Sequence, residues 1–198
     1  MSLKKFVKIS KVSNLSDARY CAGMMVDILG FDIHQSSEDY VSPTLFQEIT
    51  NWVAGIQFAA ECGGLSSNEV NDITNNYQVD FIQTDSLDVA SMLGTRAILN
   101  WIISSKEDLH SLKEWLAGSN IQHIILDVAN ESLTSDTDSL LMANTDINWI
   151  TGATISADNI ESLNPLWTGI QLEGSKEDSP GLKDYDNVMD VLEALEID

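Results

Sequence analysis

Apolar and polar positions alternate along this chain on two scales. Short runs rich in Ile, Val, Phe and Leu recur through the sequence, and between them apolar residues return every three or four positions. The short runs are nearly apolar throughout, as strands buried on both faces of a parallel sheet are. We predict strands at residues 6–10, 26–31, 52–58, 79–83, 96–103, 123–128, 148–151 and 168–172.

The stretches between these runs begin with residues that cap helix N-termini. Asn14 or Ser16 starts the first helix, and Ser42 starts the second, with Pro43 at the first helical position. Residues 184–195 close the chain with a helical pattern, whereas the polar stretch 130–144 predicts a loop with one short helix. The other predicted helix starts are Ser66 or Ser67, Ser86, Ser104 or Ser105, Ser135 and Ser156.

Eight strands, each followed by a helical pattern, predict a single (β/α)8 TIM barrel over residues 1–198. A flavodoxin-like open sheet needs only about five such units and leaves the rest of the chain unexplained. The length of 198 residues lies near the lower limit of about 200 for a barrel of this kind.

The charge of the chain restricts its partners. Ten Lys and Arg stand against 31 Asp and Glu, a formal net charge of −21. Such an acidic protein repels nucleic acid and anionic membrane surfaces, so we expect neither as a partner. No apolar run reaches the roughly 18 residues of a membrane span and no signal peptide follows the first lysines, so we expect a cytoplasmic protein.

Cysteine and histidine spacing gives no metal site. Cys21 and Cys62 are the only cysteines and are not in a CxxC arrangement, so we predict buried structural thiols. The three histidines form no HxH or HExxH pattern. We therefore expect no metal and no cofactor.

Several stretches match the motifs of one enzyme family in order and spacing. Residues 8–18 read KISKVSNLSDA, against K-I-C-G-I-T-N-x-x-D-A, and Gly30-Phe31 with YVSP at 40–43 match G-F-x-F…S-P-R-Y-V-S-P. Ile82-Gln83 matches V-Q-L-H-G, Leu126-Asp127 matches L-L-D, and SPGLKD at 179–184 matches S-P-G-x-K-D. On these residues the chain resembles phosphoribosylanthranilate isomerase over residues 8–184.

The resemblance implies a barrel of tryptophan biosynthesis that performs the Amadori rearrangement of N-(5′-phosphoribosyl)anthranilate, a phosphorylated small molecule. It places the general-acid position at Asp127 and the general-base position at Ser10, where the family has cysteine. It implies a monomer or homodimer. The substrate-binding positions carried over from the family are Asp39, Gln83, Gly152, Ala153, Gly174 and Ser175.

Departures from the family motifs predict weak or lost activity. A serine hydroxyl is far less acidic than a thiol and acts as a base only when another group takes its proton. Lys11, which replaces the family glycine, does that only if burial lowers its pKa by several units. The family arginine that holds the anthranilate carboxylate falls on Asp39, which would repel that carboxylate. The phosphate loops lose one glycine of the pair at Gly152 and gain Glu173, so we expect weak anion binding at residues 152–154 and 173–176.

Alternatives remain open at this point. Asp32 and His34 follow the second strand and offer a replacement acid–base pair, although a solvent-facing loop also explains them. The barrel is then either a divergent isomerase, acting on the family substrate or a less anionic one, or a non-catalytic binding or regulatory module.

Overall fold

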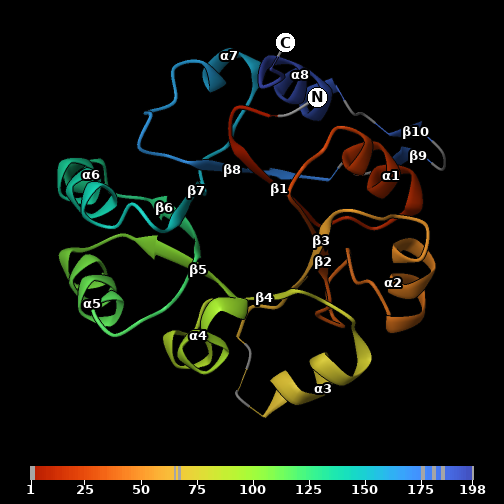
Figure 1. Cartoon of the computed structure of the whole chain (residues 1–198), viewed down its shortest axis with the longest axis horizontal. Coiled ribbons are helices and arrows are strands. Elements are labelled where there is room, and N and C mark those ends of the chain that lie inside the picture. The colour runs from red at the N-terminus through yellow and green to blue at the C-terminus, as the bar shows by residue number, and fades with distance from the viewer. Residues whose placement is uncertain are drawn as a thin grey trace.

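Eight parallel strands close into a barrel in chain order in the computed structural model, which describes residues 3–64, 66, 68–174, 177–179, 182–183 and 186–197. Figure 1 shows the strands as an inner ring with the helices around it. The last strand pairs with the first over five residues, from Phe6 opposite Gly169 to Ser10 opposite Glu173. The predicted (β/α)8 barrel is confirmed. The barrel strands are β1 Phe6–Ser10, β2 Ile28–Asp32, β3 Gln57–Glu61, β4 Phe81–Thr84, β5 Ala97–Ile103, β6 His123–Val128, β7 Asn148–Thr151 and β8 Gly169–Glu173.

The helices alternate with the strands, as the capping residues predict. Asn14, Ser42, Ser86 and Ser105 each accept a hydrogen bond from a backbone N–H in the first turn of the helix that they precede. A small hairpin, β9 Glu177–Ser179 with β10 Leu182–Lys183, lies between β8 and the last helix. The helices are α1 Leu15–Gly23, α2 Pro43–Thr50, α3 Glu69–Asn76, α4 Leu87–Leu93, α5 Lys106–Leu116, α6 Thr134–Ala143, α7 Ala157–Ile160 and α8 Asp186–Ala194, with 3₁₀ turns η1 Gly94–Arg96 and η2 Glu131–Leu133.

The clearest differences from the predictions are at β3, α3 and residues 130–144, and β2 and β4 each begin two residues later than predicted. β3 begins at Gln57 rather than at residue 52, because Trp52 is 70% exposed and Gly55 has a positive φ of 82°, so this part of the chain is a turn. α3 begins at Glu69, beyond the predicted Ser66, whose hydroxyl donates to the Glu69 carboxylate. The stretch 130–144 forms η2 followed by the regular helix α6.

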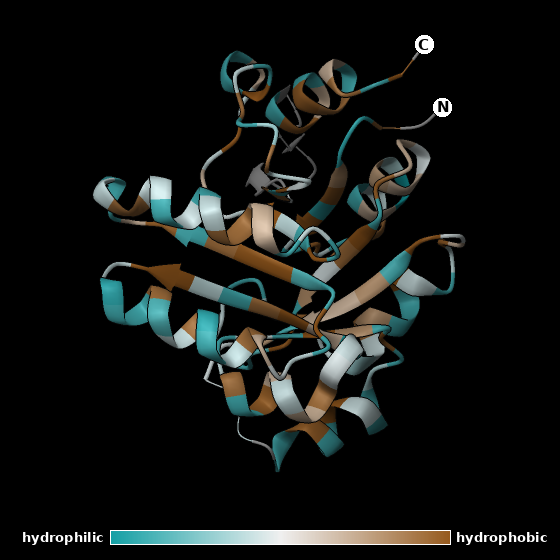
Figure 2. Ribbon diagram, turned by 60° about the vertical axis from the view of Figure 1, so that its left-hand side comes forward, coloured by the Kyte–Doolittle hydropathy of each residue, from teal (hydrophilic) through white to brown (hydrophobic). Residues whose placement is uncertain are grey.

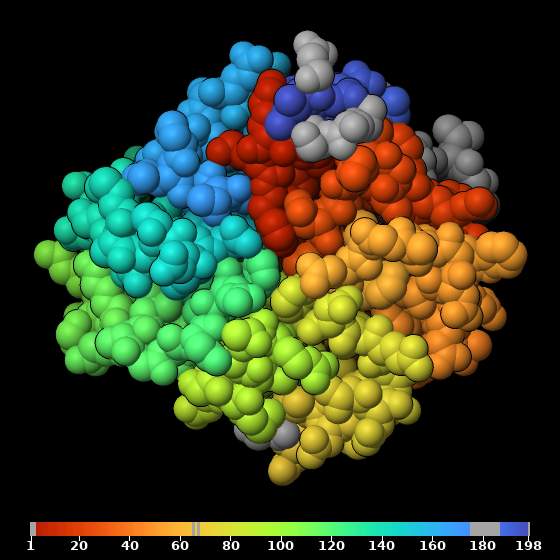
Figure 3. Space-filling model, viewed as in Figure 1, coloured from red at the N-terminus to blue at the C-terminus, as the bar shows by residue number. Residues whose placement is uncertain are grey.

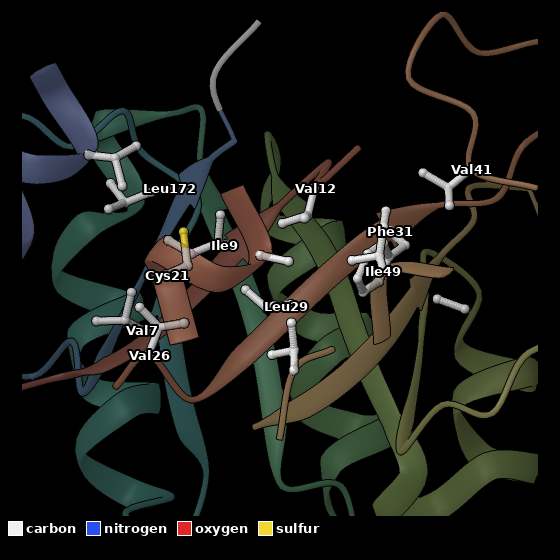
Figure 4. Close-up of a cluster of buried hydrophobic side chains, with 14 of the residues drawn as sticks. Val7, Ile9, Val12, Cys21, Val26, Leu29, Phe31, Val41, Ile49 and Leu172 are labelled. Carbon is white, nitrogen blue, oxygen red and sulfur yellow. The ribbon is translucent and has the colours of Figure 1, made fainter. Parts of the chain in front are cut away.

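Two apolar layers hold the barrel together. The outer layer lies between strands and helices, and Figure 4 shows Val7, Ile9 and Leu29 of β1 and β2 packed near Cys21 of α1 and Ile49 of α2. Figure 2 shows hydrophobic colour concentrated on the strands. Cys21 and Cys62 are both buried, as predicted.

The inner layer fills the barrel itself. Strand residues alternate between the two layers, so every second residue faces inward. In Figure 3 the successive segments form sectors whose atoms meet at the centre. The inner apolar cluster consists of Ile28, Ala59, Phe81, Ile98, Ile125 and Ile150, with Phe6 packed against it.

No helix in the described part of the chain has the length and apolar character that crossing a membrane requires.

Candidate functional site

Charged and polar residues continue the inward-facing rows at the carboxyl ends of the strands. Lys8 and Ser10 follow Phe6 in the inward row of β1, and Glu61 follows Ala59 in that of β3. Asp127 follows Ile125 in β6, so it lies at the same end of the barrel as Ser10. In (β/α)8 enzymes this is the end where chemistry takes place.

A buried network joins Lys8, Ser10 and Glu61. The Ser10 hydroxyl donates to Glu61 Oε1 at 2.7 Å and accepts from Lys8 Nζ at 2.7 Å. Lys8 Nζ also forms an ion pair with Glu61 Oε1 and donates to Gln171 Oε1 at 3.1 Å. Lys8 is fully buried, and Ser10 and Glu61 are 4% and 7% exposed. A carboxylate from another strand therefore lies within hydrogen-bond distance of the Ser10 hydroxyl.

Gly30 makes this network possible. Glu61 lies on β3 and its partners lie on β1, so its side chain has to cross β2. A Cβ at Gly30 would lie 2.0 Å from Glu61 Oε1 and 2.9 Å from Lys8 Nζ. Any side chain at position 30 would displace the carboxylate.

The Lys8 ammonium experiences two opposing effects. Complete burial lowers its pKa, whereas the charge and hydrogen bond of Glu61 raise it. Burial is the larger effect, so the pKa of Lys8 is below its usual value.

Lys11 forms a second ion pair at the rim of the cavity. Its Nζ donates to Glu173 Oε1 at 2.7 Å, and its backbone N–H donates to Glu61 Oε2 at 3.0 Å. Its φ of 56° lies in the left-handed region that favours glycine, the residue that the family has here. The hydrogen bond to Glu173 raises the pKa of Lys11, which is opposite in direction to the decrease that a Lys11 base would need.

A cavity of about 540 Å³ opens above the network. The carbonyl oxygen Oε1 of Gln83 is buried without a hydrogen-bond partner, on a strand position directly opposite Glu61. The lining includes Ser10, Asp32, Glu61, Gln83, Asn100 and Gln171.

A second cavity of about 530 Å³ adjoins the first and shares His34, Cys62 and Gly63 with it. Burial, and then the nearby carboxylates of Asp32, Asp85 and Glu61, raise the pKa of the Cys62 thiol to about 12. Cys62 is therefore a neutral thiol near neutral pH, not a nucleophile.

Asp32 and His34 do not form a side-chain pair. The Asp32 carboxylate accepts from the backbone N–H of His34 at 2.9 Å and from the Ser37 hydroxyl at 2.6 Å. His34 Nδ1 contacts the Ser36 hydroxyl instead, at 2.9 Å. These contacts form an ordered turn at the rim.

The predicted phosphate-binding amides already have partners. Gly152 N–H donates to the Leu126 carbonyl, Gly174 N–H to the Ser10 carbonyl and Ala153 N–H to Thr151 Oγ1. Ser175 and Lys176 lie outside the described residues.

Asp127 and Asp39 are not among the residues that line the cavity. A Cβ at Gly152 would be 3.0 Å from Asp127 Cβ, so the glycine lets β7 pass close to Asp127. Asp127 is partly buried and pairs in register with Ile102, whose side chain is 52% exposed. Asp39 is near enough to Lys11 for its charge to contribute to the raised pKa of that lysine.

No group of three or more His, Cys, Asp or Glu side chains in the described part of the chain is arranged to hold a metal ion.

The sequence interpretation missed Lys8 and Glu61. Both interrupt apolar strands with a charge, Lys8 within FVKIS and Glu61 at the end of QFAAE. Their inward positions two residues from Phe6 and Ala59 were a usable signal, because an unpaired charge inside a barrel is costly.

These features define a closed parallel (β/α)8 barrel with a polar cavity at the carboxyl ends of its strands. No protein-family model matches the chain, and no curated protein sequence matches it.

Solved structures of phosphoribosylanthranilate isomerases are similar to the chain in fold. The enzyme from Thermotoga maritima superposes with a TM-score of 0.75 at 18% identity, covering 96% of this chain and 97% of the other. The enzyme from Thermus thermophilus gives 0.75 at 19% identity, with 96% and 98% covered. A third, in complex with reduced 1-(o-carboxyphenylamino)-1-deoxyribulose 5-phosphate, gives 0.73 at 18%, with 96% and 97% covered. At these identities the similarity shows the fold.

Proposed function

We propose that the chain is a phosphoribosylanthranilate isomerase-like barrel whose cavity binds a small molecule and whose activity in the family reaction is weak or lost. One observation carries the proposal. At the base position, the Ser10 hydroxyl is held between Lys8 and Glu61. The Ser10 proton is committed to Glu61, and the carboxylate occupies the space beside it.

The anionic ends of the family substrate also lose their partners. The amides of Gly152, Ala153 and Gly174 are bonded within the protein, and Glu173 contributes a carboxylate to the rim. Two unit charges about 4 Å apart repel by roughly 4 kcal/mol at an effective dielectric near 20. Asp39, at the position of the family arginine, adds a second repulsion toward the anthranilate carboxylate.

Turnover of N-(5′-phosphoribosyl)anthranilate tests this proposal. We expect turnover at least roughly 10²–10⁴-fold below that of a family enzyme with the K-I-C-G motif, the contribution of one general base or acid. The matched variant is Ser10→Cys with Asp39→Arg and Glu61→Gln, which restores the thiol and the clamp and removes the competing carboxylate.

A trace of activity in that variant, abolished by Asp127→Asn, would support a barrel that kept its acid position and lost its base. Family-level turnover by the natural sequence would refute the proposal. A soak in concentrated phosphate is an independent measurement, and an ordered anion on the Gly152 and Gly174 amides would contradict the loss of the phosphate site.

A second candidate function is isomerisation of a less anionic substrate, with Glu61 as the base. The contact of 2.7 Å between Glu61 Oε1 and Ser10 Oγ favours it, because a carboxylate lies within hydrogen-bond reach of the base position. In this case, Asp127 donates the proton to the ring oxygen as the sugar opens. Enzyme-dependent exchange of the C2 hydrogen of an aldose in deuterated water, lost in Glu61→Gln, is the test. Exchange that survives Glu61→Gln would exclude Glu61 as the base.

A further inference from the structure

Each of the two lysines at this end of the barrel is paired with a carboxylate. An ammonium group has three N–H donors, and those of Lys8, beneath the cavity, go to Ser10 Oγ, Glu61 Oε1 and Gln171 Oε1. Lys11, the lysine in the described lining, forms an ion pair with Glu173. A carboxylate therefore offsets the charge of each ammonium.

Side-chain amides and carboxylates make up the rest of the polar lining. Gln83, Asn100 and Gln171 each present a carbonyl and an NH₂ group, so each both accepts and donates. Asn100 lies in the inward-facing row of β5 and is exposed there, because it lines the open cavity. Hydroxyl groups, which also donate and accept, are the natural partners of such a surface.

Gln83 is the second, independent indication. Its Oε1 is buried without a partner, and buried carbonyl groups are nearly always hydrogen-bonded. The strand position of Gln83 is directly opposite that of Glu61, at the edge of the same cavity. Because this oxygen is closed off from solvent, a ligand hydroxyl or amine would meet it after a rotation of the Gln83 side chain, which lines the cavity.

The charges around the cavity also favour a ligand without an anionic group. Lys8 offsets Glu61 and Lys11 offsets Glu173, which leaves the carboxylate of Asp32 on the lining. The whole chain carries −21, so its field attracts cations and repels anions.

We propose that this cavity binds an unphosphorylated sugar or amino sugar, held by Glu61, Gln83 and Asn100. The inference rests on the proposed function, in which the cavity is a small-molecule site. It adds the chemical class of the ligand: polyhydroxylated, and either uncharged or amine-bearing.

Titration of the full-length protein with D-ribose, D-glucosamine and D-ribose 5-phosphate is the test. Side-chain NH₂ resonances of Gln83, Asn100 and Gln171 in ¹H–¹⁵N spectra report binding at the site directly. We expect both unphosphorylated sugars to shift these resonances, and ribose 5-phosphate to bind at least about tenfold more weakly than ribose, a difference of about 1.4 kcal/mol.

Two variants separate a specific site from nonspecific contact. Gln83→Leu removes the unpartnered carbonyl, and we expect it to weaken ribose binding about fivefold, the effect of one hydrogen bond. Gln122→Leu makes the same change on an exposed residue just before β6, at the opposite end of the barrel, and should leave binding unchanged.

Two results would overturn the inference: equal or tighter binding of ribose 5-phosphate, or no shift of the three amides with either unphosphorylated sugar. Neither depends on the turnover assay. A protein that turns over the phosphorylated substrate refutes the proposed function. A protein with no turnover that also ignores both sugars refutes only the assignment of the ligand class.

Discussion

The two ends of the barrel interior are filled by different chemistry. At the amino end, His123 stacks on Phe6 with ring centroids 5.1 Å apart and meets Phe81 edge-on at 5.0 Å. At the carboxyl end, Lys8, Ser10 and Glu61 form an ionic network beneath an open cavity.

The two ends of the barrel interior differ in how strongly their stability depends on each single side chain. Aromatic and aliphatic packing is tolerant, since one side chain can be replaced by another of similar volume at modest cost. A buried ionic network does not tolerate such replacement, because removing one charged side chain leaves its partner buried and unpaired. The carboxyl end is therefore the more sensitive to single changes and the more specific in what it admits.

The largest expected effect comes from Glu61→Ala. It leaves the Lys8 ammonium buried without its counter-charge, so we expect the free energy of unfolding to fall by about 3–5 kcal/mol. Lys8→Met combined with Glu61→Gln should recover most of this loss, because no buried charge remains, Gln Oε1 can accept from Lys11 N–H and its NH₂ can donate to Ser10 Oγ. Denaturant unfolding measures both. Equal stability of Glu61→Ala and the natural sequence would mean that the network contributes nothing.

Gly30→Ala should have an intermediate effect. The new Cβ would lie 2.0 Å from Glu61 Oε1, so we expect a loss of about 1–3 kcal/mol as the carboxylate is displaced. Gly23→Ala is the control, since a Cβ there meets no atom within 4 Å. In a Glu61→Ala background, Gly30→Ala should cost much less. A purely additive double-mutant cycle would show that Gly30 does not act through Glu61.

The smallest expected effect is a pH dependence at the amino end. Burial lowers the pKa of His123, so the unfolded chain binds more protons than the folded one below the usual histidine pKa of about 6.5. Stability from this group is complete above that pH and is lost as the pH falls through the folded pKa.

His123→Phe should flatten the dependence of the free energy of unfolding on pH in this window. The control is His110→Gln, because His110 is exposed on α5, where its ring contacts Glu114. An unchanged slope in His123→Phe would assign the dependence to other groups.

The barrel could be predicted from the sequence because the evidence for each strand and helix is local. Strand composition, serine and asparagine caps and their order along the chain all depend on neighbouring residues. A predicted strand boundary was wrong where an apolar residue lies outside the strand, as exposed Trp52 does.

The network was not predicted because it depends on distant residues. Ser10 and Glu61 are separated by 51 positions in the chain and meet only after β1, β2 and β3 pair in register. From the sequence motif, Ser10 was predicted to stand at an altered base position. It contained no information that a carboxylate would cross Gly30 to reach it.

Gly30 has a consequence for how such a chain can change over time. Because a side chain at position 30 and a carboxylate at position 61 compete for the same space, the two substitutions cannot accumulate in any order. A lineage has to hold glycine at position 30 before it acquires glutamate at position 61. Once the glutamate compensates Lys8, the glycine can no longer be exchanged freely. Each member of the network therefore makes the loss of the others more damaging.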